Sequence, residues 1–133
     1  MSSILIIDDE AEVSQALRRV LERAGFQVTT CLSGAEGLEA FRLSPSDVVI
    51  TDIIMPKMNG VAVLQQIRAH RPQTGIIAIS GGGNFGPLDY RPEAITTSAY
   101  LAAATQAGAD AVLTKPFDKD ELLKTVRRIL DQR

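Results

Sequence analysis

The chain has 133 residues, of which 45% are hydrophobic, and its sixteen acidic and fourteen basic side chains give a net charge of −2. This length suits one well-buried domain and is too short for two. The pI near 5.4 excludes the strongly basic balance on which non-specific nucleic-acid binding depends, so we expect no direct nucleic-acid partner.

The first third of the chain alternates between strand and helix patterns. An apolar run at residues 4–7 predicts a buried strand. Apolar residues at helical spacing follow, and Gly25 stands where a helix C-terminus often needs a left-handed residue. Residues 27–31 are rich in β-branched side chains, which favours a second strand. The predicted helical face consists of Val13, Ala16, Leu17, Val20, Leu21 and Ala24.

The middle of the chain repeats this alternation. Ser33 followed by Glu36 is a capping-box signature, which predicts a helix that ends before the next proline. Residues 47–51 predict the third strand. Asn59 is expected to cap the helix that follows, and Pro72 is expected to end it.

The last third completes the pattern. Residues 75–80 predict a fourth strand, and an alanine-rich helix is expected to end at Gly108. The apolar run at 111–114 predicts the fifth strand, and Asp118 with Glu121 forms a second capping pair at the start of the final helix. The order βαβαβαβαβα predicts a doubly wound α/β fold, in which helices cover both faces of a parallel sheet.

Polar side chains stand at the ends of four of the predicted strands. Asp8 and Asp9 follow the first strand, Asp52 the third, Ser80 the fourth and Lys115 the fifth. Ligands of an open parallel sheet bind beyond the carboxyl ends of its strands, so we expect these groups to converge in one crevice. Three carboxylates and one ammonium leave two negative charges, which a divalent cation would balance. Because the candidate ligands are all oxygens, Mg²⁺ or Mn²⁺ is favoured.

A simpler interpretation is that Asp8 and Asp9 only cap the first helix, where acidic side chains suit the helix dipole. It leaves Asp52 and Lys115 unexplained, so we prefer the cation site.

The single cysteine and the short apolar runs indicate where the protein works. Cys31 has no second cysteine to pair with, which fits a reducing cytosol. The first apolar run is too short for a signal peptide, and no stretch approaches the roughly 20 apolar residues that span a bilayer. We therefore expect a cytoplasmic protein without a membrane partner.

The residues at the strand ends resemble a receiver domain, the response-regulator module of two-component signal transduction. The resemblance is carried by Asp8 and Asp9, by the block Asp-Ile-Ile-Met-Pro-Lys-Met-Asn-Gly at 52–60, by Ser80, and by Lys-Pro-Phe at 115–117. It covers essentially residues 1–133 as one domain. It implies a flavodoxin-like, chemotaxis-regulator-like sheet of five strands in the order 2-1-3-4-5.

The resemblance also implies roles for the site residues. Asp52 would be the nucleophile that accepts a phosphoryl group by in-line attack. Asp9, Asp52 and the backbone carbonyl of Ile54 would hold Mg²⁺, and Asp8 would act mainly through a bound water. Lys115 would pair with Asp52 at rest and with a phosphoryl oxygen afterwards.

Three further positions belong to the implied switch. Ser80 would move to hydrogen-bond the new phosphoryl oxygen. Pro116 is expected to follow a cis peptide that aims Lys115 inward. Val112 stands where the family usually has an aromatic ring that swings inward on activation.

One segment departs from the family pattern. The spacing from Ser80 to Lys115 exceeds the family norm by roughly a dozen residues, which indicates an inserted glycine-rich loop at about 81–92. Our hypothesis is that this loop reshapes the partner-binding face; a disordered spacer is the alternative. The candidate anchors in the loop are Phe85, Leu88 and Tyr90.

The preferred function is a signalling receiver rather than an enzyme. A sensor histidine kinase or a histidine phosphotransfer protein would be its phosphodonor, and an unknown downstream protein would read its state. The receiver would act as a monomer or as a phosphorylation-dependent dimer. The alternatives are an interaction module of the same fold that takes no phosphate, and a Mg²⁺-dependent phosphohydrolase. Filled acceptor, metal and lysine positions disfavour the first, and the lack of a second general acid disfavours the second.

Overall fold

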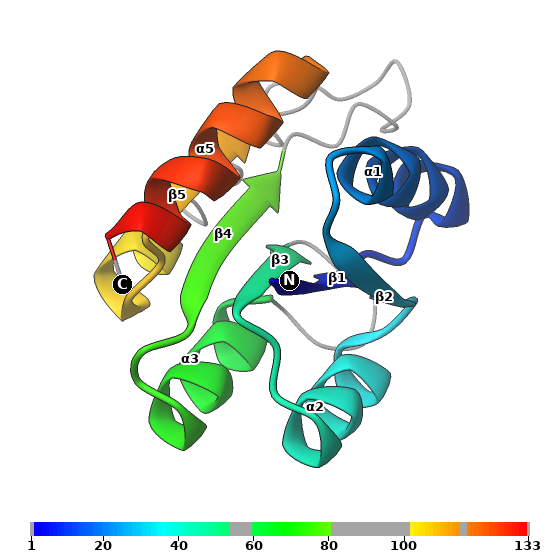
Figure 1. Cartoon of the computed structure of the whole chain (residues 1–133). Helices are drawn as coiled ribbons and strands as arrows, with labels where there is room; N and C mark the ends of the chain where they lie inside the picture. The colour runs from blue at the N-terminus through cyan, green and yellow to red at the C-terminus, as the bar shows by residue number, and fades with distance from the viewer. Residues whose placement is uncertain (1, 54–59, 81–101, 115–116, 133) are drawn as a thin grey trace, which may run out of the picture.

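Five parallel strands form the centre of the fold in the order β2-β1-β3-β4-β5 (Figure 1). The structure, a computed structural model, describes residues 2–53, 60–80, 102–114 and 117–132. The predicted sheet order and α/β class are confirmed. The strands are β1 (Ser3–Ile7), β2 (Gln27–Cys31), β3 (Val48–Asp52), β4 (Gly75–Ser80) and β5 (Ala111–Thr114).

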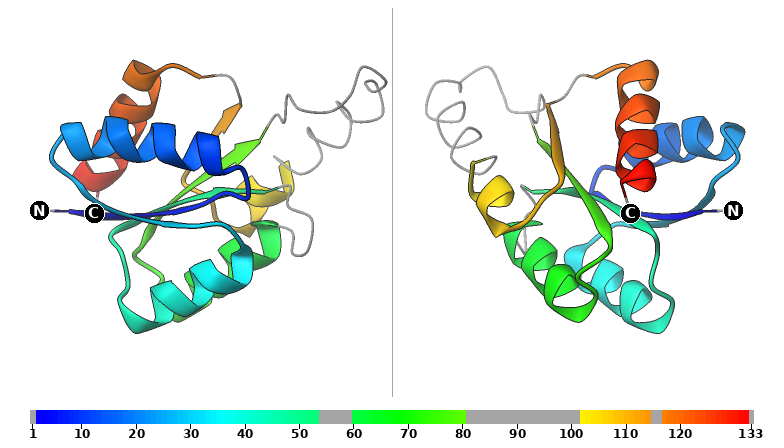
Figure 2. Two further views of the ribbon diagram at one scale, coloured as in Figure 1. Left: turned by 90° about the vertical axis from the view of Figure 1, so that its right-hand side faces the viewer. Right: turned by 60° about the vertical axis from the view of Figure 1, so that its left-hand side comes forward.

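Helices cover both faces of this sheet (Figure 2). The helices α1 and α5 lie on one face, and α2 and α3 lie on the other. Residues 102–107 are also helical, and Ala104 belongs to the apolar cluster on the α2 and α3 side. The helix bounds are α1 (Ala11–Arg23), α2 (Gly34–Leu43), α3 (Gly60–His70) and α5 (Lys119–Asp131).

The central strand β3 shows why the sequence folds in this way. All five of its residues are buried, as a parallel strand between two helical layers requires. Val48 and Ile50 pack into the cluster that contains residues of α1 and α5, whereas Val49 packs with α2 and α3. Successive side chains of a strand point to opposite faces, so one apolar run supplies both cores.

Four of the predicted helix ends are confirmed. The side chain of Ser33 accepts a hydrogen bond from the backbone N–H of Glu36 at 3.1 Å, and Asp118 accepts one from the N–H of Glu121 at 2.8 Å. Gly25 has φ +99° and Gly108 has φ +116°, the left-handed conformations that end helices.

The third strand lies one residue later than predicted. It begins at Val48, and the carboxylate of the preceding Asp47 accepts a hydrogen bond from the backbone N–H of Ser3 at 2.9 Å. It extends to Asp52, whose Cα pairs with Ile79 of β4.

The expected cap at Asn59 lies outside the described residues, as does the loop at 81–92. Within the described segments, no helix combines the length and apolar character that crossing a membrane requires.

Candidate functional site

Two aspartates lie at the carboxyl edge of adjacent strands. Asp52 is the last residue of β3, and Asp8 directly follows β1. Because β1 and β3 are parallel neighbours, with Ile7 paired with Thr51, these aspartates meet at the same edge of the sheet. Asp8 is fully buried and Asp52 is 5% exposed. The predicted convergence of these two residues is therefore observed.

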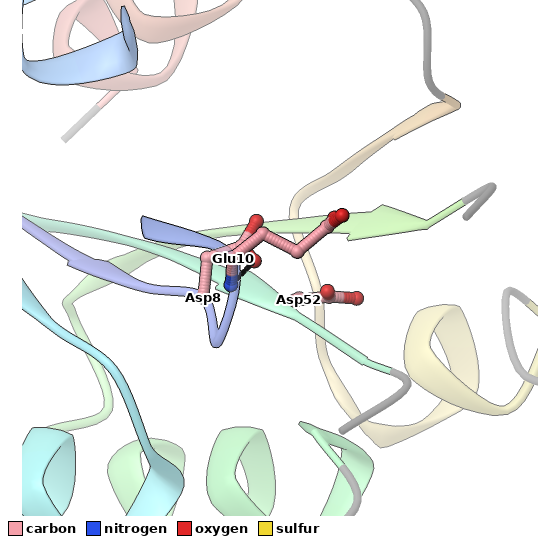
Figure 3. A group of neighbouring side chains, drawn as sticks. All are labelled: Asp8, Glu10 and Asp52. Atoms are coloured by element: carbon pink, nitrogen blue, oxygen red, sulfur yellow. Dashed lines mark hydrogen bonds between the residues drawn. The ribbon is translucent and has the colours of Figure 1, made fainter. Parts of the chain in front are cut away.

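A third carboxylate joins them. Asp8, Glu10 and Asp52 each offer one oxygen, and these oxygens lie within 4.8 Å of one another (Figure 3). Carboxylates about 5 Å apart repel by about 3 kcal/mol at an effective dielectric of about 20. Such a group is costly to assemble without positive charge, so its geometry favours a cation.

The main chain holds Asp8 in place. Its N–H donates to the carbonyl of Cys31 in β2 at 3.1 Å, and its carbonyl accepts a bond from the hydroxyl of Ser14 at 3.3 Å. Its Oδ1 accepts a bond from the backbone N–H of Glu10 at 2.9 Å. The turn after β1 is thereby fixed at three points around one buried carboxylate.

Sequence reasoning did not assign a role to Glu10. It occupies the N-cap position of α1 in an extended conformation, with φ −93° and ψ 105°, and its side chain makes no capping hydrogen bond. In Figure 3 the side chain instead reaches over Asp52. Asp9, the expected metal ligand, is exposed and is not a member of the three-carboxylate group.

Gly60 brings the start of α3 against the end of β3. A Cβ at this position would collide with the backbone carbonyl oxygen of Asp52 and with the Cα of Ile53. The N–H of Gly60 donates to the carbonyl of Ile53 at 3.0 Å. The glycine at the end of the 52–60 block therefore has a steric reason: only the smallest residue fits against the strand that carries Asp52.

The remaining predicted residues are only partly described. Lys115, Pro116 and Ile54 lie outside the described residues. The backbone of Ser80 ends β4 and pairs with Thr114 of β5, next to the strand that carries Asp52. Val112 lies in β5 and is 38% exposed.

The donor set fits the expected cation. The ligand atoms of the group are all carboxylate oxygens, and two of the three side chains are more than nine-tenths buried. Hard oxygen donors without imidazole or thiolate suit Mg²⁺ or Mn²⁺ better than Zn²⁺.

Known proteins resemble this chain over nearly its whole length. A family model described as the response regulator receiver domain matches residues 4–127. The DNA-binding transcriptional regulator NtrC of Escherichia coli K12 is 36% identical over 96% of the chain, which spans 24% of that protein. The transcriptional regulatory protein KdpE of Mycobacterium tuberculosis is 37% identical over 96% of the chain, which spans 50% of it. The chain thus spans between a quarter and a half of these relatives.

Solved structures give the same picture. A CheY-like response regulator receiver domain protein from Methanospirillum hungatei superposes with a TM-score of 0.85 at 26% identity, covering 99% of this chain and 95% of that one. A response regulator receiver domain protein from Clostridium thermocellum gives a TM-score of 0.81 at 31% identity, covering 99% and 96%.

Proposed function

The chain belongs to the response-regulator receiver domains of two-component systems, and on that basis we propose that Asp52 accepts a phosphoryl group in a Mg²⁺-dependent reaction. The donor is a sensor histidine kinase or a histidine phosphotransfer protein. The observation that carries the proposal is the position of Asp52: a buried carboxylate at the end of β3, with oxygens of Asp8 and Glu10 within 4.8 Å.

In the proposed transfer, a carboxylate oxygen of Asp52 attacks the phosphorus in line with the bond to the donor. The bond from phosphorus to the donor breaks as the new P–O bond forms, and the donor leaves with the electron pair. Asp9, Asp52 and the backbone carbonyl of Ile54 would hold Mg²⁺, with Asp8 acting mainly through a bound water, and the ion would neutralise charge on the phosphoryl oxygens.

The other site residues keep the roles that the resemblance implied. Lys115 pairs with Asp52 before transfer and with a phosphoryl oxygen afterwards, and Pro116 aims it inward. Ser80 hydrogen-bonds the phosphoryl group, which transmits the new state to the surface. Support for Ser80 comes from β4, which carries it to the same edge of the sheet as Asp52.

We propose that the direct partners of this chain are proteins. Its net charge of −2 gives little electrostatic attraction to nucleic acid. The downstream binding partner is therefore expected to be another protein or a second copy of the chain. The named relatives are transcriptional regulators of which this chain spans a quarter to a half, so their activity as whole proteins does not assign a DNA contact to this chain.

The intact mass of the protein tests the proposed function. The chain is incubated with Mg²⁺ and acetyl phosphate, and a single phosphoryl adduct is expected. The adduct should be lost in Asp52→Asn and on chelation of Mg²⁺, and it should be kept in Glu12→Gln, which removes an exposed carboxylate from the first turn of α1.

Two other outcomes would contradict the proposal. No adduct in the wild-type chain, with the fold intact, would indicate an interaction module that takes no phosphate. Continuous release of phosphate without an adduct would indicate a phosphohydrolase.

A further inference from the structure

The carboxylate of Glu10 adds a third negative charge to the two that Asp8 and Asp52 bring to this site. Glu10 directly follows Asp8 and Asp9 in the sequence, and it supplies an oxygen within 4.8 Å of oxygens of both Asp8 and Asp52. An inference about its role rests on the proposed function, because it concerns the cation and the phosphoryl group that this site is proposed to bind.

The backbone explains why Glu10 turns towards Asp52. Its N–H donates to the carboxylate of Asp8 at 2.9 Å, which fixes the residue at the start of α1. N-cap side chains usually accept a bond from the first turn of their helix, but Glu10 makes no such bond. Its side chain, which is one methylene longer than that of an aspartate, reaches over Asp52 instead (Figure 3).

The position of Glu10 has two electrostatic consequences. A third negative charge strengthens the attraction of the three-carboxylate group for a divalent cation. It also repels a phosphodonor, which is itself an anion, for as long as the cation is absent. Both effects act in the same direction, because each makes phosphorylation of Asp52 depend more strongly on Mg²⁺.

We propose that Glu10 is a specificity-determining residue of this site: its carboxylate, held beside Asp8 and Asp52, raises the affinity for Mg²⁺ and couples entry of the phosphoryl group to the bound cation. The charge, rather than the shape of the side chain, carries the effect.

Three variants separate this role from others. Glu10→Gln removes the charge and keeps the size of the side chain, whereas Glu10→Asp keeps the charge on a shorter arm. Glu12→Gln is the matched control, because it removes one exposed carboxylate from the same helix turn, outside the three-carboxylate group. Circular dichroism and thermal melting confirm that all variants fold.

Calorimetry measures Mg²⁺ affinity directly, without any phosphodonor. We expect Glu10→Gln to weaken Mg²⁺ binding by about tenfold, after allowance for solvent screening of a partly buried group. Glu10→Asp should stay within about threefold of the wild-type affinity, and so should Glu12→Gln, because Glu12 is exposed and lies outside the three-carboxylate group. The Mg²⁺ concentration for half-maximal adduct formation should rise with the dissociation constant.

The outcomes distinguish the inference from the proposed function. If the wild-type chain binds Mg²⁺ and forms the adduct but Glu10→Gln behaves like Glu12→Gln, the role of Glu10 is wrong and the phosphoacceptor stands. If Glu10→Asp is as weak as Glu10→Gln, charge is not the cause and the proposal is also wrong. If the wild-type chain takes up no Mg²⁺, the proposed function itself fails.

Discussion

Arg68 and Asp110, 42 residues apart in the sequence, form an ion pair with 2.9 Å between guanidinium nitrogen and carboxylate oxygen. The same carboxylate oxygen accepts the backbone N–H of Ile76 at 2.8 Å. Arg68 therefore ties the end of α3 to the first residues of β4 and to the turn before β5. Its guanidinium also donates to the backbone carbonyls of Pro72, Thr74 and Gly108.

Replacing Arg68 by Ala should lower the free energy of unfolding by about 2 kcal/mol, because the two partly buried carbonyls of Thr74 and Gly108 lose their donor. Urea denaturation measures the change. Arg42→Ala is the control: Arg42 pairs with Glu39 at 2.6 Å on an exposed helix surface, and its loss should leave stability indistinguishable from wild type. Equal effects of the two substitutions would contradict the role given to Arg68.

Replacing Gly60 by Ala should lower stability by about 2 kcal/mol and slow adduct formation at Asp52, because the new methyl group displaces the end of β3. Gly25→Ala is a useful comparison. Its φ of +99° should cost about 1 kcal/mol of strain, but nothing lies within 4 Å of the added carbon, so adduct formation should be unchanged. Normal adduct formation in Gly60→Ala would show that the close approach does not position Asp52.

Mg²⁺ should stabilise the folded chain. At a free concentration ten times its dissociation constant, a cation that binds only the folded state adds about 1.4 kcal/mol, which is a rise of roughly 3–6 °C in Tm for a chain of this size. Differential scanning calorimetry measures the shift. The rise should be much smaller in Asp52→Asn, and potassium chloride at equal ionic strength serves as the control. Equal shifts with both salts would argue against a specific site.

Cys31 should react slowly with alkylating reagents in the folded protein. Burial raises the pKa of its thiol, and the nearby Glu36 carboxylate raises it further. Because the thiolate is the reactive form, alkylation at pH 8 should be several-fold slower than in the urea-unfolded chain. A folded rate equal to the unfolded rate would contradict this.

The same pKa shift affects stability at alkaline pH. The folded thiol holds its proton more tightly than the unfolded thiol, so its contribution is complete below the unfolded pKa and is lost as pH rises through the folded pKa. Cys31→Ser should therefore lose less stability than wild type above pH 9. Parallel stability curves for the two proteins would contradict the expectation.

The phosphorylated state should be long-lived. Ile54, two residues beyond the acceptor, has no polar group to orient an attacking water, so hydrolysis should be limited by water positioning. Ile54→Asn should shorten the half-life of the adduct by about tenfold or more. A half-life that changes little would mean that another group positions the water.

The sheet and the meeting of Asp8 with Asp52 were predictable because each rests on a local pattern. Apolar runs with helical spacing between them define parallel strands, and parallel strands bring their carboxyl ends to one edge. The helix caps at Ser33 and Asp118 were predictable for the same reason, since capping involves residues three apart.

Glu10 and Arg68 were not predicted, for different physical reasons. The strand β1 ends at Ile7, and with it the rule that successive side chains point to opposite faces of the sheet. The sequence therefore does not tell which of the following acidic side chains lies beside Asp52, and in the structure it is Glu10, whose backbone is extended. The available signal was a glutamate at the N-cap of α1, where the shorter Ser, Thr, Asp and Asn are preferred. Arg68 bonds to carbonyls that become neighbours only after folding. Every residue has a backbone carbonyl, so the sequence does not show which ones will accept these bonds.

The burial of β3 on both faces has a consequence for how such a domain can diversify. Asp52, which we propose as the phosphoacceptor, is anchored by a strand with no solvent-facing side chain, whereas the exposed side chains of α1, α2, α3 and α5 lie on the outside of the molecule. The proposed phosphoacceptor and the surface that is open to other proteins therefore occupy separate parts of the molecule. If the proposed function holds, exposed helix residues grafted from a homologue should change which proteins bind this domain and leave phosphorylation of Asp52 unchanged.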